Sequence, residues 1–209
     1  MNLEPFDNFN PDDPDRLLAA YAHAEAVEIK RQDREFCQAI AEIRQEEAEA
    51  NGRRPGMDRV VTTREREVDD HFLGALGELA VCKYLGLFPE IDGNFDTSRR
   101  DLFGILEVRA RRGHHRDLLI KHSEDFKKGG TRTPWALVTF SEKKPYKTAL
   151  FHGWINLADA LALGQQVIIP GRGPRILVRS NQLRSPRELP GIIPTASLPV
   201  FLQSRRFES

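Results

Sequence analysis

Glu78 is an acidic residue in an unusual place, because it lies inside an apolar segment with Leu76, Leu79 and Val81 close by in the sequence. A carboxylate among apolar side chains is costly unless it is paired or bound to a metal ion. Glu78 is therefore a candidate metal ligand. Two structural alternatives stay open for it alone: a place on a solvated stripe of a helix, or an ion pair with an arginine.

Asp101 and Glu107 form a second acidic pair, in the segment RRDLFGILEVRARR. Side chains alternate along a strand, so Glu107 and Arg109 are expected on one face and Val108 on the other. Asp101 faces Glu107 if residues 103–105 form a three-residue hairpin loop, whereas a two-residue turn would place Asp101 on the other face. Two facing carboxylates repel, and a divalent cation between them relieves this. The alternative is a surface hairpin whose acids pair with nearby arginines.

Basic residues are concentrated around this pair. Between positions 99 and 121 they are Arg99, Arg100, Arg109, Arg111, Arg112, Arg116 and Lys121. Such a patch suits the phosphate backbone of a nucleic acid. A solvated loop with local ion pairs is the alternative interpretation.

The N-terminal third is predicted to be mainly helical. Asp13 followed by Pro14 is typical of a helix start, and no proline or glycine follows until Gly52. We therefore expect residues 1–61 to form an arm, a long helix to about Ala50, in one piece or two, and a linker. Thr62 or Thr63 is expected to cap a second, buried helix that carries Glu78 and runs to about Leu87.

The remaining sequence is predicted to form strands and one short helix. The expected strands are LEVRA, DLLIK, WALVTF, TALFHGWI and RILVRS, and NLADALALG is expected to be a helix that ends at Gly164. The order indicates an α/β (α+β) domain over residues 62–184 with a long N-terminal helical extension. Residues 185–209, which carry several prolines, are expected to run over the surface.

Together these features resemble the PD-(D/E)XK nuclease superfamily. The likeness spans residues 68–141 and rests on Glu in GALGELAVCKYLG, the following Asp, a strand with Glu-Val-Arg, and DLLIK. LFHGWI and RILVRSNQLRS resemble the downstream part of small phage-like members. The resemblance implies a restriction-endonuclease-like α-β-β-β-α-β core and a Mg²⁺-dependent deoxyribonuclease, an endonuclease acting on DNA. Glu78, Asp101, Glu107 and the carbonyl of Val108 would hold Mg²⁺ or Mn²⁺.

Two residues depart from the superfamily pattern. Arg109 stands where lysine is usual, and arginine does not readily accept a proton. Lys121 on the next strand could supply a displaced ammonium, and Arg100 rather than proline precedes Asp101. We expect Arg109 or Lys121 to stabilise the transition state, and we expect five arginines to contact DNA: Arg99, Arg100, Arg111, Arg112 and Arg116.

Arg109 also keeps an alternative open, a catalytically weak or inactive DNA-binding protein with a nuclease fold. A third hypothesis is an assembly protein that forms a homodimer or binds a partner through its N-terminal helix. The chain has 31 basic and 31 acidic residues, so its net charge predicts no anionic partner. Two cysteines without CxxC spacing, no long apolar run and no signal-peptide pattern predict a soluble, cytoplasmic protein without membrane contact.

Overall fold

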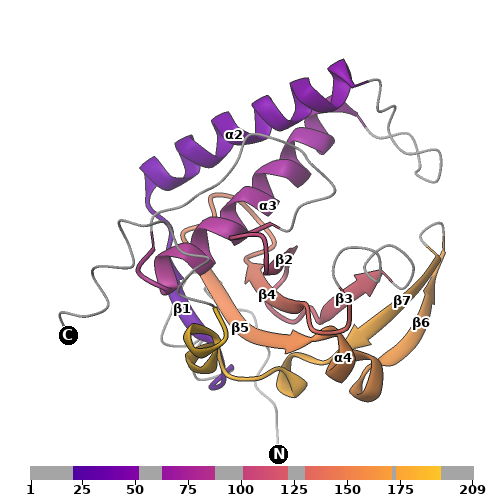
Figure 1. Ribbon diagram of the computed structural model, residues 1–209. Coiled ribbons are helices and arrows are strands. Elements are labelled where there is room, and N and C mark those ends of the chain that lie inside the picture. The colour runs from indigo at the N-terminus through magenta and orange to yellow at the C-terminus, as the bar shows by residue number, and fades with distance from the viewer. Residues whose placement is uncertain (1–20, 52–62, 88–100, 122–129, 171–172, 194–209) are drawn as a thin grey trace, which may run out of the picture.

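The computed structural model describes residues 21–51, 63–87, 101–121, 130–170 and 173–193. It is an α+β structure with two sheets, which confirms the expected class (Figure 1). The first sheet has the order β1-β5-β4-β2, where β2 and β4 are parallel and the other pairs antiparallel. Its strands are β1 (Glu25–Glu28), β2 (Glu107–Arg112), β4 (Pro134–Phe140) and β5 (Thr148–Asn156). The second, antiparallel sheet joins β3 (Leu118–Lys121), β7 (Gly173–Val178) and β6 (Gln165–Ile169) in that order.

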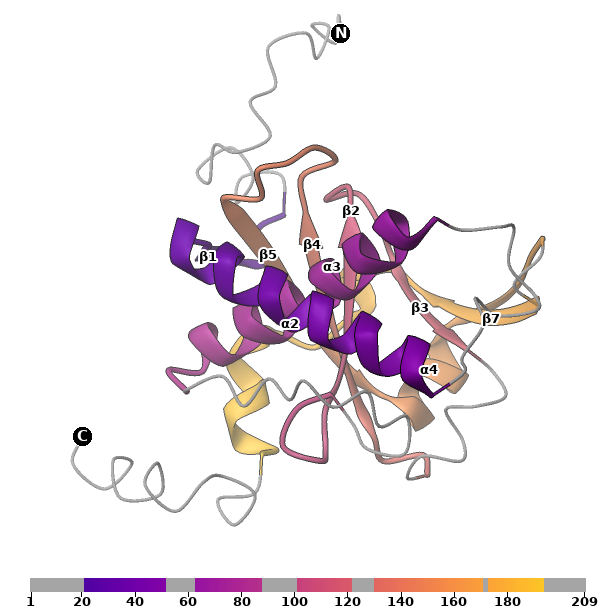
Figure 2. The ribbon, with the colours of Figure 1, turned by 90° about the horizontal axis from the view of Figure 1, so that it is seen from above.

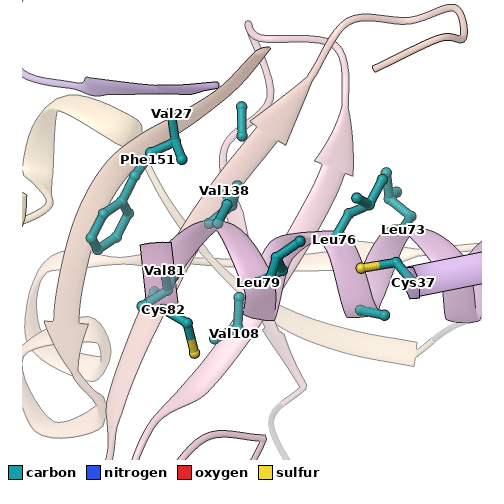
Figure 3. Packing of buried hydrophobic residues seen from close by; sticks show 14 of the residues in the cluster. Val27, Cys37, Leu73, Leu76, Leu79, Val81, Cys82, Val108, Val138 and Phe151 are labelled. Carbon is teal, nitrogen blue, oxygen red and sulfur yellow. The ribbon is translucent and has the colours of Figure 1, made fainter. Parts of the chain in front are cut away.

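Two long helices cover one face of the first sheet (Figures 1 and 2). They are α2 (Arg31–Ala50) and α3 (Arg64–Tyr84). Leu76, Leu79 and Val81 of α3 lie in one buried core with Val108 and Val138 of the strands (Figure 3). None of the helices in the described ranges is long and apolar enough to cross a membrane.

The N-terminal segment corrects the prediction that the chain from Asp13 to about Ala50 is helical, in one piece or two, because part of it is a strand. Residues 13–20 lie outside the described ranges, but Glu25–Glu28 form strand β1, and α2 begins only at Arg31. Strand β1 pairs with the edge of β5, and Val27 is buried in the main core near Phe151 (Figure 3). Backbone pairing and burial here outweigh the local helix propensity, which is a weak determinant.

Helix α3 begins where its sequence predicts. The side chain of Thr63 accepts a hydrogen bond from the Arg66 N–H and caps the helix. Gly77 is needed where α3 meets β2, because a Cβ atom at this position would lie 2.8 Å from the Cβ of Ala110. Helix α3 therefore packs closely against β2 at this point, next to Glu78 in the sequence.

A second core lies on the opposite face of β4. The side chains of β4 alternate, so Ala136 and Val138 pack under the helices while Trp135 and Leu137 pack against the second sheet. Helix α4 (Leu157–Leu163) contributes Leu157 to this second core. The first sheet lies between the two cores and contributes side chains to both.

The expected strands and the helix that ends at Gly164 are confirmed, and β6 is an additional strand. The prediction of a surface tail from Ser185 needs correction over its described part. Two short 3-10 helices, Ser180–Gln182 and Pro186–Gly191, follow β7. Leu189 and Ile193 are buried in the main core, so residues 186–193 pack against the domain; residues 194–209 lie outside the described ranges.

Candidate functional site

The hairpin that carries the acidic pair has the three-residue connection expected from the sequence. Leu102 and Leu106 form an antiparallel bridge, and residues 103–105 connect them. Phe103 and Gly104 both have positive φ angles, 54° and 67°, as such tight loops require. The register places Asp101 beside the start of β2, where Glu107 lies.

Asp101 is fixed at the outer edge of β2. Its Oδ2 atom accepts a hydrogen bond from the backbone N–H of Val108, at 2.7 Å. In an extended strand the N–H and C=O of one residue point to the same edge. The carbonyl of Val108 therefore also points to the edge where Asp101 lies.

Glu107 is buried on the face of β2 that is turned away from the helices. Only 1% of this residue is exposed, and it lies in register with Trp135 of β4. The guanidinium of Arg109 lies over the Trp135 ring, 4.6 Å from its centroid. From there its Nη2 is 3.7 Å from Glu107 Oε2 and its Nη1 is 4.0 Å from Asp101 Oδ2. Arg109 therefore spans the two carboxylates.

Glu78 is also buried, but its partner comes from α2. Arg44 binds it with two hydrogen bonds, Nη1 to Oε1 at 2.9 Å and Nη2 to Oε2 at 2.8 Å. Burial raises the pKa of Glu78 to about 7; Arg44 opposes this rise and the negative charge of Asp101 adds to it. The structure thus realises the ion-pair alternative for Glu78 and places its carboxylate at the contact between the two helices.

The three predicted acids are arranged with arginines between them. Arg109 connects Asp101 with Glu107, while Arg44 binds Glu78 and is near enough to Asp101 for that charge to raise its own pKa. Within the described ranges, no three acidic, histidine or cysteine side chains are placed to hold one metal ion. Asp101 and Glu107 therefore share one partner, Arg109, whereas Glu78 is bound by Arg44.

Lys121 lies on a different sheet from the acids. Strand β3 pairs with β7 rather than with β2, and Leu118 and Ile120 point into the core that contains Trp135. Lys121 alternates with them, so it lies on the face turned away from that core. This orientation leaves Arg109 as the basic residue beside the acidic pair.

The predicted DNA-binding arginines lie in different places. Arg111 and Arg112 alternate to opposite faces of β2: Arg111 donates to the carbonyl of Asp117, and Arg112 is ion-paired with Asp69 on α3. Arg112 is therefore part of the packing between α3 and β2, and its assignment to DNA binding stays a prediction. Arg116 is exposed. Arg99 and Arg100 lie outside the described residues.

A buried polar cluster lies farther along the same face of the first sheet. The hydroxyl of Thr139 contacts His114 Nδ1 at 3.0 Å and His152 Nε2 at 2.8 Å. The rings of Tyr21 and His23 lie against His152, at centroid distances of 5.3 and 5.6 Å. Burial, with smaller contributions from His23 and His114, lowers the pKa of His152 to about 3. This histidine is therefore neutral in the folded protein.

The donor set around Asp101 fits a hard divalent cation in part. Mg²⁺ is commonly bound by one or two carboxylates, with water and substrate phosphate completing its octahedron. Asp101, Glu107 and the Val108 carbonyl match this smaller set, and the guanidinium of Arg109 shows that positive charge is stabilised beside both acids. Glu78 does not join this set, because Arg44 already binds both of its oxygens.

Sequence reasoning missed Arg44 and the role of Trp135. Arg44 is one of many charged residues in α2, so no local pattern distinguishes it, and the contact between Trp135 and Arg109 depends on how β2 and β4 pair. Comparison of the chain with family models, curated proteins and solved structures finds no match.

Proposed function

We propose that the chain is a metal-dependent DNA endonuclease with a restriction-endonuclease-like core, whose cation site consists of Asp101, Glu107 and the carbonyl of Val108. The observation that carries the proposal is the placement of two carboxylates, one almost completely buried, on opposite sides of the Arg109 guanidinium. A buried acid such as Glu107 is expensive without a positive charge beside it. Glu78 is assigned a different role, as the acid that fastens α2 to α3.

The order of elements from α3 onward also supports this core. Helix α3 is followed by β2, β3 and β4, and then, after β5, by α4 and two further strands. This sequence contains the expected α-β-β-β-α-β order with β5 inserted before the helix and a hairpin at the end. Glu78 lies on the helix and Glu107 on the first strand of that series, and Asp101 lies in the hairpin that leads into this strand.

Each residue of the site has a separate task. Asp101 and Glu107 would hold Mg²⁺ or Mn²⁺, and the bound ion would supply Lewis-acid activation of water and of the scissile phosphate. Arg109, whose guanidinium lies over the Trp135 ring, offers several N–H donors to phosphate oxygens. Arginine does not readily accept a proton, so Arg109 would stabilise charge rather than act as a base, and the enzyme is expected to be slow.

A second function is favoured by one observation, a guanidinium already placed between the acids. In that case the fold binds DNA through Arg109 and exposed residues such as Arg116 but does not cleave it. The two functions differ in whether the DNA is cleaved when Mg²⁺ or Mn²⁺ is added.

A plasmid-nicking assay with Mg²⁺ and Mn²⁺ tests the proposal. Asp101→Ala and Glu107→Ala should abolish cleavage but leave DNA binding in a gel-shift assay, because phosphate contacts use other residues. Asp159→Ala, which removes a surface acid paired with Arg184, is the matched control and should cleave normally. Cleavage by both site variants at the wild-type rate would reject the site, and binding without metal-dependent cleavage would establish the second function.

The same assay distinguishes the roles of Arg109 and Lys121. Arg109→Ala should lose on the order of 10²–10³ in rate, which is typical for one positioned donor. Lys121→Ala should retain near-wild-type cleavage, because its side chain lies on the other face of β3. A larger loss at Lys121 than at Arg109 would contradict the assignment of Arg109.

A further inference from the structure

An exposed apolar cluster lies where α4 passes into β6. Leu161, Leu163 and Ile168 are 36%, 56% and 83% exposed. Within the described ranges these are three of the six large apolar side chains that are exposed, and all three lie in one short segment. Scattered exposed apolar residues are ordinary, but a concentrated group marks an interaction surface.

The same segment forms the edge of a sheet. Strand β6 pairs with β7 in continuous register from Gln165–Leu177 to Ile169–Gly173, and no described strand pairs with its other side. Figure 1 shows β6 at the outer margin of the molecule, far from α2. Its sequence, QQVII, contains no charged residue. Edge strands are usually protected by charges, prolines or bulges, because their free backbone groups accept another strand.

The residue types of β6 favour its own copy as the partner. In an antiparallel pair related by a two-fold axis at Ile168, that residue faces its own copy and Val167 faces Ile169 of the other chain. All three pairs of facing residues are apolar, and no like charges face each other across the axis. We propose that β6 is a dimerisation edge at which the strand pairs antiparallel with β6 of a second copy, joining two three-stranded sheets into one.

The outer face of α2 is less suited to self-association. Phe36 and Ile43 are exposed there, but Glu35, Glu42 and Glu49 follow one another at heptad spacing along the same exposed side. In an antiparallel pair of α2 helices these acids would face each other and repel. The uncharged β6 edge has no such cost.

Sedimentation velocity and light scattering across the micromolar range test the dimer. The wild-type chain should be a dimer that dissociates on dilution. Ile168→Lys should weaken dimerisation by at least about 100-fold, because it removes two buried isoleucines and places two charges across the axis. Ile43→Lys is the matched control, since it makes the same change at an exposed isoleucine of α2, and it should leave the dimer intact.

Cysteine cross-linking tests the register. Cys37 and Cys82 are fully buried, so they give little background. Ile168→Cys should form an intermolecular disulfide under mild oxidation, because paired residues on neighbouring strands bring their Cβ atoms close. Gln166→Cys should not cross-link, since its two copies would lie on the order of 13 Å apart.

A wild-type chain that stays monomeric, or an Ile168→Lys variant that dimerises like the wild type, would overturn the proposal. Loss of the dimer in Ile43→Lys instead would move the interface to α2. Cross-linking at Gln166→Cys but not at Ile168→Cys would overturn the two-fold pairing at Ile168.

Discussion

His152 should make the protein sensitive to acid. The side chain is fully buried, and its Nε2 contacts the Thr139 hydroxyl while Tyr21 and His23 pack on its ring. Burial lowers the pKa of His152 to about 3, well below about 6.5 for an unfolded histidine. Between these values the unfolded chain binds a proton that the folded chain does not. Stability is therefore lost as the pH falls below the unfolded value.

The size of the loss follows from this difference. At about pH 5 the unfolded histidine is almost fully protonated and the folded one is not, which corresponds to a loss of about 2 kcal/mol relative to neutral pH. His152→Gln keeps a polar group near Thr139 but cannot titrate, so its free energy of unfolding should lack this component. Other groups, Glu78 among them, titrate in both proteins and cancel in the comparison.

Urea unfolding at neutral pH and at about pH 5 measures the difference for each protein. The change in unfolding free energy between the two pH values should differ by about 2 kcal/mol between wild type and His152→Gln. His115→Gln, at the exposed histidine that follows His114, is the control and should behave as the wild type does. Equal acid sensitivity of wild type and His152→Gln would refute the reasoning, whatever the absolute stability of the variant.

Two further predictions concern the packing of the helices, and both can be measured by urea unfolding. Arg44→Ala should destabilise the fold by about 3–5 kcal/mol, because it leaves the buried Glu78 carboxylate without its bidentate partner; a loss below 1 kcal/mol would speak against a charged Glu78. Gly77→Ala should cost about 1–3 kcal/mol, since its methyl group would collide with Ala110. Gly74→Ala on the same helix meets no atom within 4 Å and should stabilise by up to about 1 kcal/mol, so equal effects at the two glycines would contradict the close contact.

Local signals explain which parts of the fold could be predicted. The Thr63 cap, the alternating strands and the three-residue loop at Gly104 all depend on residues a few positions apart. The unusual position of Glu78 was also visible, because a carboxylate inside an apolar helix can be read from neighbouring residues. Its burial and its arginine partner follow that expectation, but the identity of Arg44 depends on how α2 and α3 pack.

Tertiary contacts explain what could not be predicted. Residues 25–28 have a helix-compatible composition and become a strand only because β5 offers them an edge. Lys121 was expected beside β2, yet β3 pairs with β7, a choice that no local pattern reports. Strand β6 is short, and its five residues carry neither a clear alternation nor a turn signal strong enough to distinguish them from a loop.

The pairing of β1 with β5 has a consequence for synthesis and folding. Glu25 pairs with Phe151, so the first described strand to leave the ribosome has to wait for one of the last strands of the same sheet. Contacts between residues so distant along the chain close large loops and form slowly. Until β5 has emerged, β1 lacks its partner strand, and a nascent chain stalled before residue 148 should present this strand to chaperones. Deleting residues 1–55 would expose the opposite surface permanently, namely the edge of β5 and the side of α3 that carries Glu78, because it removes both an edge strand of the sheet and the helix that buries Glu78.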